Sequence, residues 1–166
     1  KTMHLGRLFK LAQTHPGFVW WNWTDTYYGS SKQEPLNSPS VFNFYTPVYQ
    51  APGEIRNAGL VSPGFQIVDT YSSISFPNLV WEYLHRGFRS SYQWWYPLDY
   101  SGALLLAENP VALVDHVNLL VCTGNMTART RGLLLTALAD PALAAKERVA
   151  LAIWTAMTSP EGAVQR

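Results

Sequence analysis

The chain has 166 residues, 48% of them hydrophobic and only 14% charged, which fits a single globular domain with a sizeable core. Its 12 basic and 11 acidic side chains leave a formal net charge of +1, which argues against a nucleic-acid partner. Binding a phosphate backbone requires a clustered excess of Lys and Arg. Cys122 is the only cysteine, so the sequence allows no intrachain disulfide.

The ends and apolar runs of the chain bear on its organisation. The first residues, KTMHLGRLFKLAQTHPG, lack the unbroken apolar core and cleavage site of a signal peptide. Charged residues such as Asp115 interrupt the longest apolar runs, so we expect no membrane span. The length fits one domain over residues 1–166, and a start at Lys1 without a Met is typical of a fragment or a processed product of a longer protein.

The N-terminal part combines a short amphipathic helix, predicted over residues 3–14, with an aromatic segment. Residues 18–31, FVWWNWTDTYYGSS, contain Trp20, Trp21 and Trp23. Two interpretations are open. Either the rings stack on a carbohydrate, since flat rings pack on pyranose faces, or they pack in the core against neighbouring helices.

The segment Pro35 to Ile67 is rich in both proline and apolar residues. Each of its five prolines fixes φ and favours an extended residue before it. Between the prolines lie more apolar side chains than a solvated linker carries. We therefore predict an ordered, mostly non-helical strap, with Phe42, Phe44 and Tyr45 packed against the helices.

The chain after the strap is predicted to turn helical. Ser62 has the position of an N-cap before Pro63. Pro77 interrupts the apolar pattern that follows, which predicts a kink or two helices, over 64–75 and 77–86.

A second aromatic loop, GFRSSYQWWYPLDYS at 87–101, contains Trp94 and Trp95 and precedes the remaining helices. Thr127 is expected to cap one helix, and another is expected to end at Thr158. A capping side chain followed by proline at the first helical position predicts three further starts. These are Asn109-Pro110, Asp140-Pro141 and Ser159-Pro160.

The strap sequence resembles a known family. Its run PLNSPSVFNFYTPVYQAPGEIRNAGLVSPGFQI is similar to the signature PLxSPSVFNFYxPxYxxPGxIxxAGLVxPEFQI of the bacterial domain of unknown function 1800 family. The resemblance extends from about Gln33 to Arg166, and departs from the family at Gly64, where Glu is usual, and at Pro77. It implies a longer parent chain of which this is the C-terminal portion, and export to the periplasm or the cell exterior.

Catalytic motifs of high specificity are not evident, and we expect no cofactor and no metal. Glu82 and His85 are spaced as Glu-x-x-His, but a di-iron site needs a second such pair, so a solvated helix face is the better interpretation. Asp25 and Asp99 lie among aromatic residues, as glycosidase carboxylates do if their loops converge. The alternative is that each caps a local turn. Cys122 fits a small buried residue better than an activated thiol.

These features predict a mainly α-helical fold of five or six helices clamped by the proline-rich, mostly non-helical strap. One predicted function is an accessory or binding role in an exported bacterial protein, in contact with the preceding part of that protein. The alternative is a carbohydrate-active enzyme or carbohydrate-binding module that holds a polysaccharide or oligosaccharide. Its ligand-binding residues would be Trp20, Trp21, Trp23, Trp94 and Trp95.

The carbohydrate hypothesis predicts that at least two of these five rings stack on a glycan, near Asp25 or Asp99. Titration with cello-, xylo- and glucan oligosaccharides should then quench the tryptophan fluorescence. Trp21→Ala and Trp95→Ala should each reduce that quenching. If no sugar quenches the fluorescence and all five rings are buried, the rings are core residues and the carbohydrate interpretation is wrong.

Overall fold

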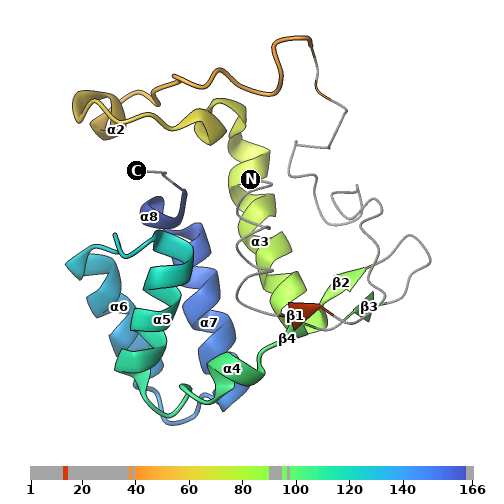
Figure 1. Cartoon of the computed structure of the whole chain (residues 1–166), viewed down its shortest axis with the longest axis vertical. Helices are drawn as coiled ribbons and strands as arrows, with labels where there is room; N and C mark the ends of the chain where they lie inside the picture. Colours follow the sequence, from red (N-terminus) through yellow and green to blue (C-terminus); the bar gives the residue numbers. More distant parts are fainter. Residues whose placement is uncertain (1–12, 15–37, 39, 90–94, 97, 164–166) are drawn as a thin grey trace.

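The computed structural model describes residues 13–14, 38, 40–89, 95–96 and 98–163, which form a mainly α-helical fold with a mostly non-helical strap, as predicted (Figure 1). The α-helices are α2 (Glu54–Asn57), α3 (Thr70–Arg86), α4 (Ser101–Leu104), α5 (Pro110–Cys122), α6 (Ala128–Leu138), α7 (Ala145–Thr158) and α8 (Pro160–Ala163). A 3-10 helix, η1, spans Pro63–Ile67. The strands are β1 (Gln13–Thr14), β2 (Phe88–Arg89), β3 (Trp95–Tyr96) and β4 (Leu98–Asp99).

Helix α7 lies at the centre of the helical part. It contacts α3, α4, α5, α6 and α8, and Figure 1 shows α5, α6 and α7 together with α3 on the other side of α7. The buried residues of α7 include three alanines, whose small side chains let neighbouring backbones approach closely. These buried residues are Val149, Ala150, Ala152, Ile153, Ala156 and Met157.

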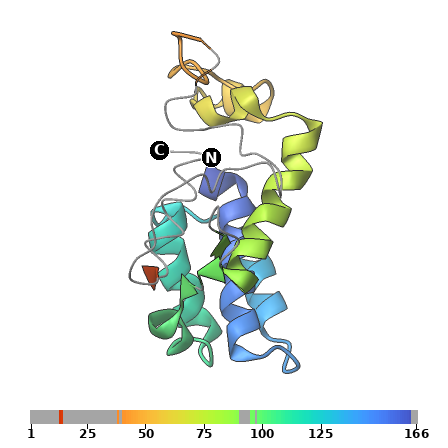
Figure 2. The same ribbon diagram turned by 90° about the vertical axis from the view of Figure 1, so that its right-hand side faces the viewer.

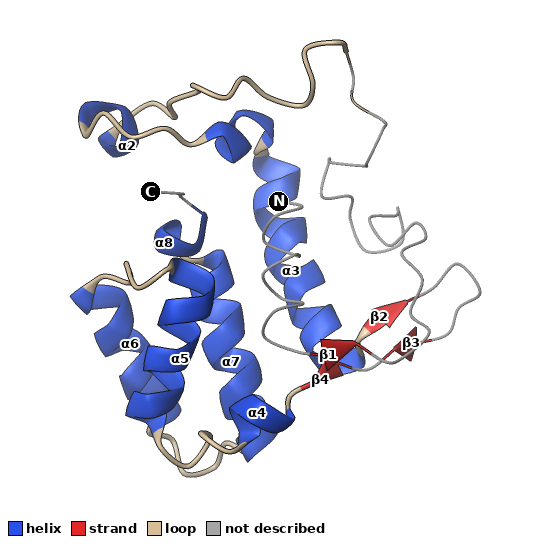
Figure 3. Ribbon diagram, viewed as in Figure 1, coloured by secondary structure: helices blue, strands red, loops and turns tan. Residues whose placement is uncertain are grey.

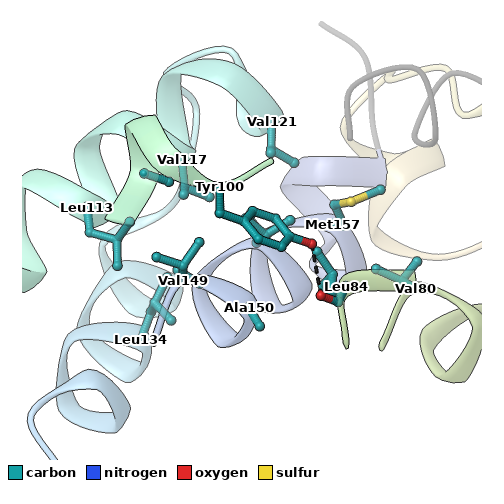
Figure 4. Packing of buried hydrophobic residues seen from close by; sticks show 14 of the residues in the cluster. Val80, Leu84, Tyr100, Leu113, Val117, Val121, Leu134, Val149, Ala150 and Met157 are labelled. Atoms are coloured by element: carbon teal, nitrogen blue, oxygen red, sulfur yellow. Dashed lines mark hydrogen bonds between the residues drawn. The ribbon is translucent and has the colours of Figure 1, made fainter. Parts of the chain in front are cut away.

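The buried side chains form one cluster that joins the four long helices. Figure 4 shows Tyr100 within this cluster, where its hydroxyl donates a hydrogen bond of 3.0 Å to the backbone oxygen of Leu84. Burial raises the pKa of Tyr100, so the hydroxyl keeps its proton and remains a donor. This bond ties the start of α4 to the C-terminal end of α3.

Two short antiparallel strand pairs lie near the C-terminal end of α3 (Figure 3). In the first, Gln13 of β1 is in register with Asp99 of β4. In the second, Arg89 of β2 is in register with Trp95 of β3. The second pair closes the aromatic loop of the sequence as a hairpin.

Three helix starts follow the predicted capping chemistry. The side chain of Asn109 accepts from the backbone N–H of Ala112 at 3.1 Å and begins α5. Thr127 likewise accepts from the N–H of Thr130 at 3.2 Å. Ser159 accepts from the N–H of Gly162 at 3.2 Å, so the predicted C-terminal helical turn is confirmed over Pro160–Ala163.

Two helix boundaries differ from the sequence prediction. One helix, α3, runs unbroken through Pro77, and its N-cap is Asp69, whose side chain forms a capping box with Ser72. Helix α7 begins at Ala145 and not near Asp140. The Asp140 carboxylate instead accepts from the N–H of Ala142, two residues ahead, at 2.8 Å, and this bond stabilises a local turn.

Two expectations for the strap are also wrong. The Ser62 hydroxyl does not cap η1 but accepts from the N–H of Ala51 at 3.0 Å, within the strap. Phe42 does not pack against the helices, because 81% of its surface is exposed. The strap is therefore ordered by its own polar contacts at this point and not by burial of Phe42.

Neighbouring leucines on α6 offer a direct test of the core. Leu134 is buried at 1% exposure, whereas Leu133 is 64% exposed. Leu134→Ala should lower the free energy of unfolding by about 2–5 kcal/mol, because it removes buried methyl groups and leaves a cavity. Leu133→Ala should change it by less than about 0.5 kcal/mol. Urea denaturation measures both, and equal effects would contradict the packing of α6.

Candidate functional site

Most of the tryptophans proposed for sugar binding lie outside the described residues. Trp20, Trp21, Trp23 and Asp25 fall between 15 and 37, and Trp94 falls between 90 and 94. The backbone of Trp95 is described, in β3. The carbohydrate site built from these residues therefore stays a prediction.

Asp99 is described, and its contacts are local. Its carboxylate accepts from the backbone N–H of Ser101 at 2.8 Å, across the turn between β4 and α4. Hydrogen bonds from the backbone and the side chain of Ser101 hold the pKa of Asp99 below its usual value, against a smaller opposing effect of burial. The carboxylate is thus an ionised turn cap, which matches the alternative given by the sequence.

The two side chains of the Glu-x-x-His pair have different partners. Glu82 makes an ion pair of 3.1 Å with Arg86, while His85 Nε2 lies 2.9 Å from Glu147 Oε2 on α7. No group of three or more His, Cys, Asp or Glu side chains gathers anywhere in the described part of the chain. Cys122 is buried, as the sequence analysis expected.

The strap consists of two limbs that hydrogen-bond to each other, with α2 at the tip between them (Figure 1). The Gln66 side chain accepts from both the backbone N–H and the hydroxyl of Thr46, at 2.7 and 3.1 Å. Further along, the N–H of Ser62 donates to the backbone oxygen of Tyr49 at 2.8 Å, beside the bond from Ala51 to Ser62 Oγ. These contacts fix the limbs without a hydrophobic core of their own.

Several large apolar side chains of the strap project into solvent. Val41, Phe42 and Val48 are 95%, 81% and 76% exposed, and we call these three residues the strap surface. Charge is sparse around them: between residues 38 and 69 the sequence has only Glu54, Arg56 and Asp69. Exposed apolar side chains on an ordered scaffold are typical of interaction sites.

An aromatic cluster, which no sequence motif indicated, joins α3 to α7. The Trp81 ring lies 4.2 Å from the His85 ring and packs edge-to-face with Trp154 at 5.8 Å between centroids. Trp154 donates its indole N–H to the backbone oxygen of Pro77 at 2.9 Å. His85 Nδ1 lies 2.8 Å from the Trp81 carbonyl oxygen, and Nε2 lies 2.9 Å from Glu147 Oε2, so each ring nitrogen faces an oxygen atom.

The C-terminal helix α8 supplies a carboxylate to the start of α6. Glu161 Oε1 accepts from the backbone N–H of Thr127 at 3.2 Å and from the hydroxyl of Thr130 at 3.0 Å. Burial alone would raise the pKa of Glu161, but hydrogen bonds from Thr127, from its own backbone and from Thr130 outweigh it and lower the pKa. An ionised carboxylate at a helix N-terminus also interacts favourably with the helix dipole.

Comparisons with protein-family models, with curated proteins and with solved structures gave no match to this chain. None of the described helices has the length and apolarity to cross a membrane. The exposed strap surface is therefore the feature that bears on function.

The Glu161 contacts predict how stability depends on pH. Because the pKa is lowered in the folded state, these contacts stabilise the fold above the ordinary carboxyl value of 4.5. That stabilisation should be lost as the pH falls below this value through the folded-state pKa. In Glu161→Gln the corresponding part of the pH dependence should be absent, as measured by urea denaturation between about pH 2 and 6. Parallel curves for the parent and the variant would refute the assignment.

Proposed function

We propose that this chain is an accessory, binding part of a longer exported bacterial protein, and that its strap surface contacts the preceding region of that protein. The observation that carries the proposal is the exposure of Val41, Phe42 and Val48 on a strap held by internal hydrogen bonds. Exposure of such apolar side chains to water is unfavourable, and burial against a partner lowers the free energy by removing them from water.

The chemistry of the strap favours an apolar protein partner. With only three charged residues between 38 and 69, the strap has little to attract a polyanion or a charged membrane surface. Aromatic and aliphatic side chains of this kind form the centres of protein interfaces. The family resemblance implies both the preceding region and the export of the whole chain.

A binding experiment tests the proposal. The preceding region of the parent protein and residues 1–166 are produced separately, and their affinity is measured by calorimetry. Phe42→Asp and Val48→Asp should each weaken binding by about tenfold or more, because each places a charge in an apolar interface.

Leu133→Asp supplies the matched control. It adds the same charge at an exposed leucine of α6, away from the strap, and should leave the affinity unchanged. Circular dichroism and thermal melting check that all variants stay folded. Wild-type affinity in both strap variants would exclude the strap as the contact surface.

A further inference from the structure

Two residues of the strap surface occupy the middle of a β-turn. The backbone N–H of Asn43 donates to the backbone oxygen of Ser40 at 3.1 Å and closes this turn, which we call the first turn. Val41 and Phe42 are its two middle residues. The Ser40 hydroxyl accepts from the N–H of Phe42 at 3.2 Å, and Asn43 Oδ1 accepts from the N–H of Phe44 at 2.9 Å. Bonds between near neighbours thus hold the first turn in shape.

The third residue of the strap surface occupies the same kind of position. The N–H of Tyr49 donates to the backbone oxygen of Thr46 at 3.1 Å and closes a second turn, with Pro47 and Val48 in the middle. Proline fixes φ at the first of these two positions, where it is common. The two bonds from Thr46 to Gln66 hold this turn against the other limb of the strap.

The apolar side chains at these positions contribute little to the fold of the chain. The middle of a β-turn is its most convex part, and Gly, Asn, Asp, Ser and Pro are the residues that usually occupy it. Val41, Phe42 and Val48 are almost fully in solvent, so they bury little apolar area within the chain. Polar residues could close the same turns. The presence of apolar residues there is therefore better explained by contact with a partner.

We infer that the two turns are apolar knobs that enter two separate pockets on the preceding region of the parent protein, an inference that rests on the proposed function. A convex turn is covered well only by a concave surface, because closely packed interfaces match in shape. One pocket takes Phe42 with Val41 beside it, and the other takes the smaller Val48. The sequence has no charged side chain from residue 38 to residue 53, so both pockets are expected to be apolar.

A region joined ahead of Lys1 lies within reach of the strap. Gln13 is in register with Asp99 near the C-terminal end of α3, whereas the strap joins the N-terminal end (Figures 1 and 3). Helix α3 has 17 residues and is about 25 Å long. Residues 1–12 can span up to about 40 Å when extended. Because a covalent link gives an effective concentration of about millimolar order, two small pockets are enough to hold the strap.

Substitutions of Phe42 test for a pocket in the calorimetric assay described above. Phe42→Ala should weaken binding about tenfold or more, because it removes the ring that fills the pocket. Phe42→Trp should weaken binding about fivefold or more, because the larger ring overfills a pocket shaped for phenylalanine. On a flat apolar surface, the larger ring would bind at least as tightly as the parent, and that result would overturn the inference. Leu133→Trp, at an exposed leucine of α6, should leave the affinity unchanged.

Substitutions of Asn43 test whether the shape of the first turn matters. Its φ is 70°, in the left-handed region that glycine adopts freely and alanine does not. Asn43→Gly and Asn43→Ala both remove the side-chain bond to Phe44, and neither changes an apolar side chain of the strap surface. Asn43→Ala should bind about threefold or more weakly than Asn43→Gly, because alanine disfavours the turn that presents Phe42. Equal affinities of the two variants would overturn the inference.

A double-mutant cycle tests whether the pockets are separate. The fold losses of Phe42→Ala and Val48→Ala should multiply in the double variant, since independent sites contribute additively to the free energy of binding. A loss well below the product would show one shared pocket and overturn the two-pocket arrangement.

The aspartate variants separate this inference from the proposed function. If Phe42→Asp and Val48→Asp both bind like the parent, the proposed function and the inference are both wrong. If both bind weakly while Phe42→Trp binds like the parent, the strap remains the contact surface and only the arrangement of knobs and pockets is wrong.

Discussion

The burial of α7 is the constraint on which the rest of the structure depends. Five other helices contact it, and its alanines at 150, 152 and 156 leave room for their backbones. Most of these neighbours are too short to be stable alone in water, since isolated helices of this length are marginal. They are helical because α7 gives each of them an apolar surface to cover.

The strap is ordered in a different way from the helices that pack around α7. The strap is ordered by hydrogen bonds that the side chains of Gln66 and Ser62 accept, and Val41, Phe42 and Val48 stay in solvent. Figures 1 and 2 both show it at one end of the molecule, joined to the helical part through α3. Order without burial leaves an apolar surface ready for contact.

Local chemistry explains which parts of the fold the sequence could predict. The side chains of Asn109, Thr127 and Ser159 each accept from the N–H three residues ahead, so a few adjacent residues are enough to predict these caps. Asp140 has the same sequence context as Asn109, yet it bonds two residues ahead and makes a turn. The start of α7 depends instead on the packing of this helix against helices that are distant in the sequence, such as α3.

The candidate surfaces were harder to predict for a related reason. The exposure of Phe42 depends on where the strap lies relative to the helices, which no local pattern records. The contact between His85 and Glu147 joins residues that are 62 positions apart in the sequence, and the contact between Pro77 and Trp154 joins residues that are 77 positions apart. Such long separations also matter while the chain is being made. The strap can close within its own 21 residues, from Thr46 to Gln66, as soon as they leave the ribosome. Helix α3 must wait until α7 has been made, and the side chains of α3 that pack on α7 are exposed in the meantime.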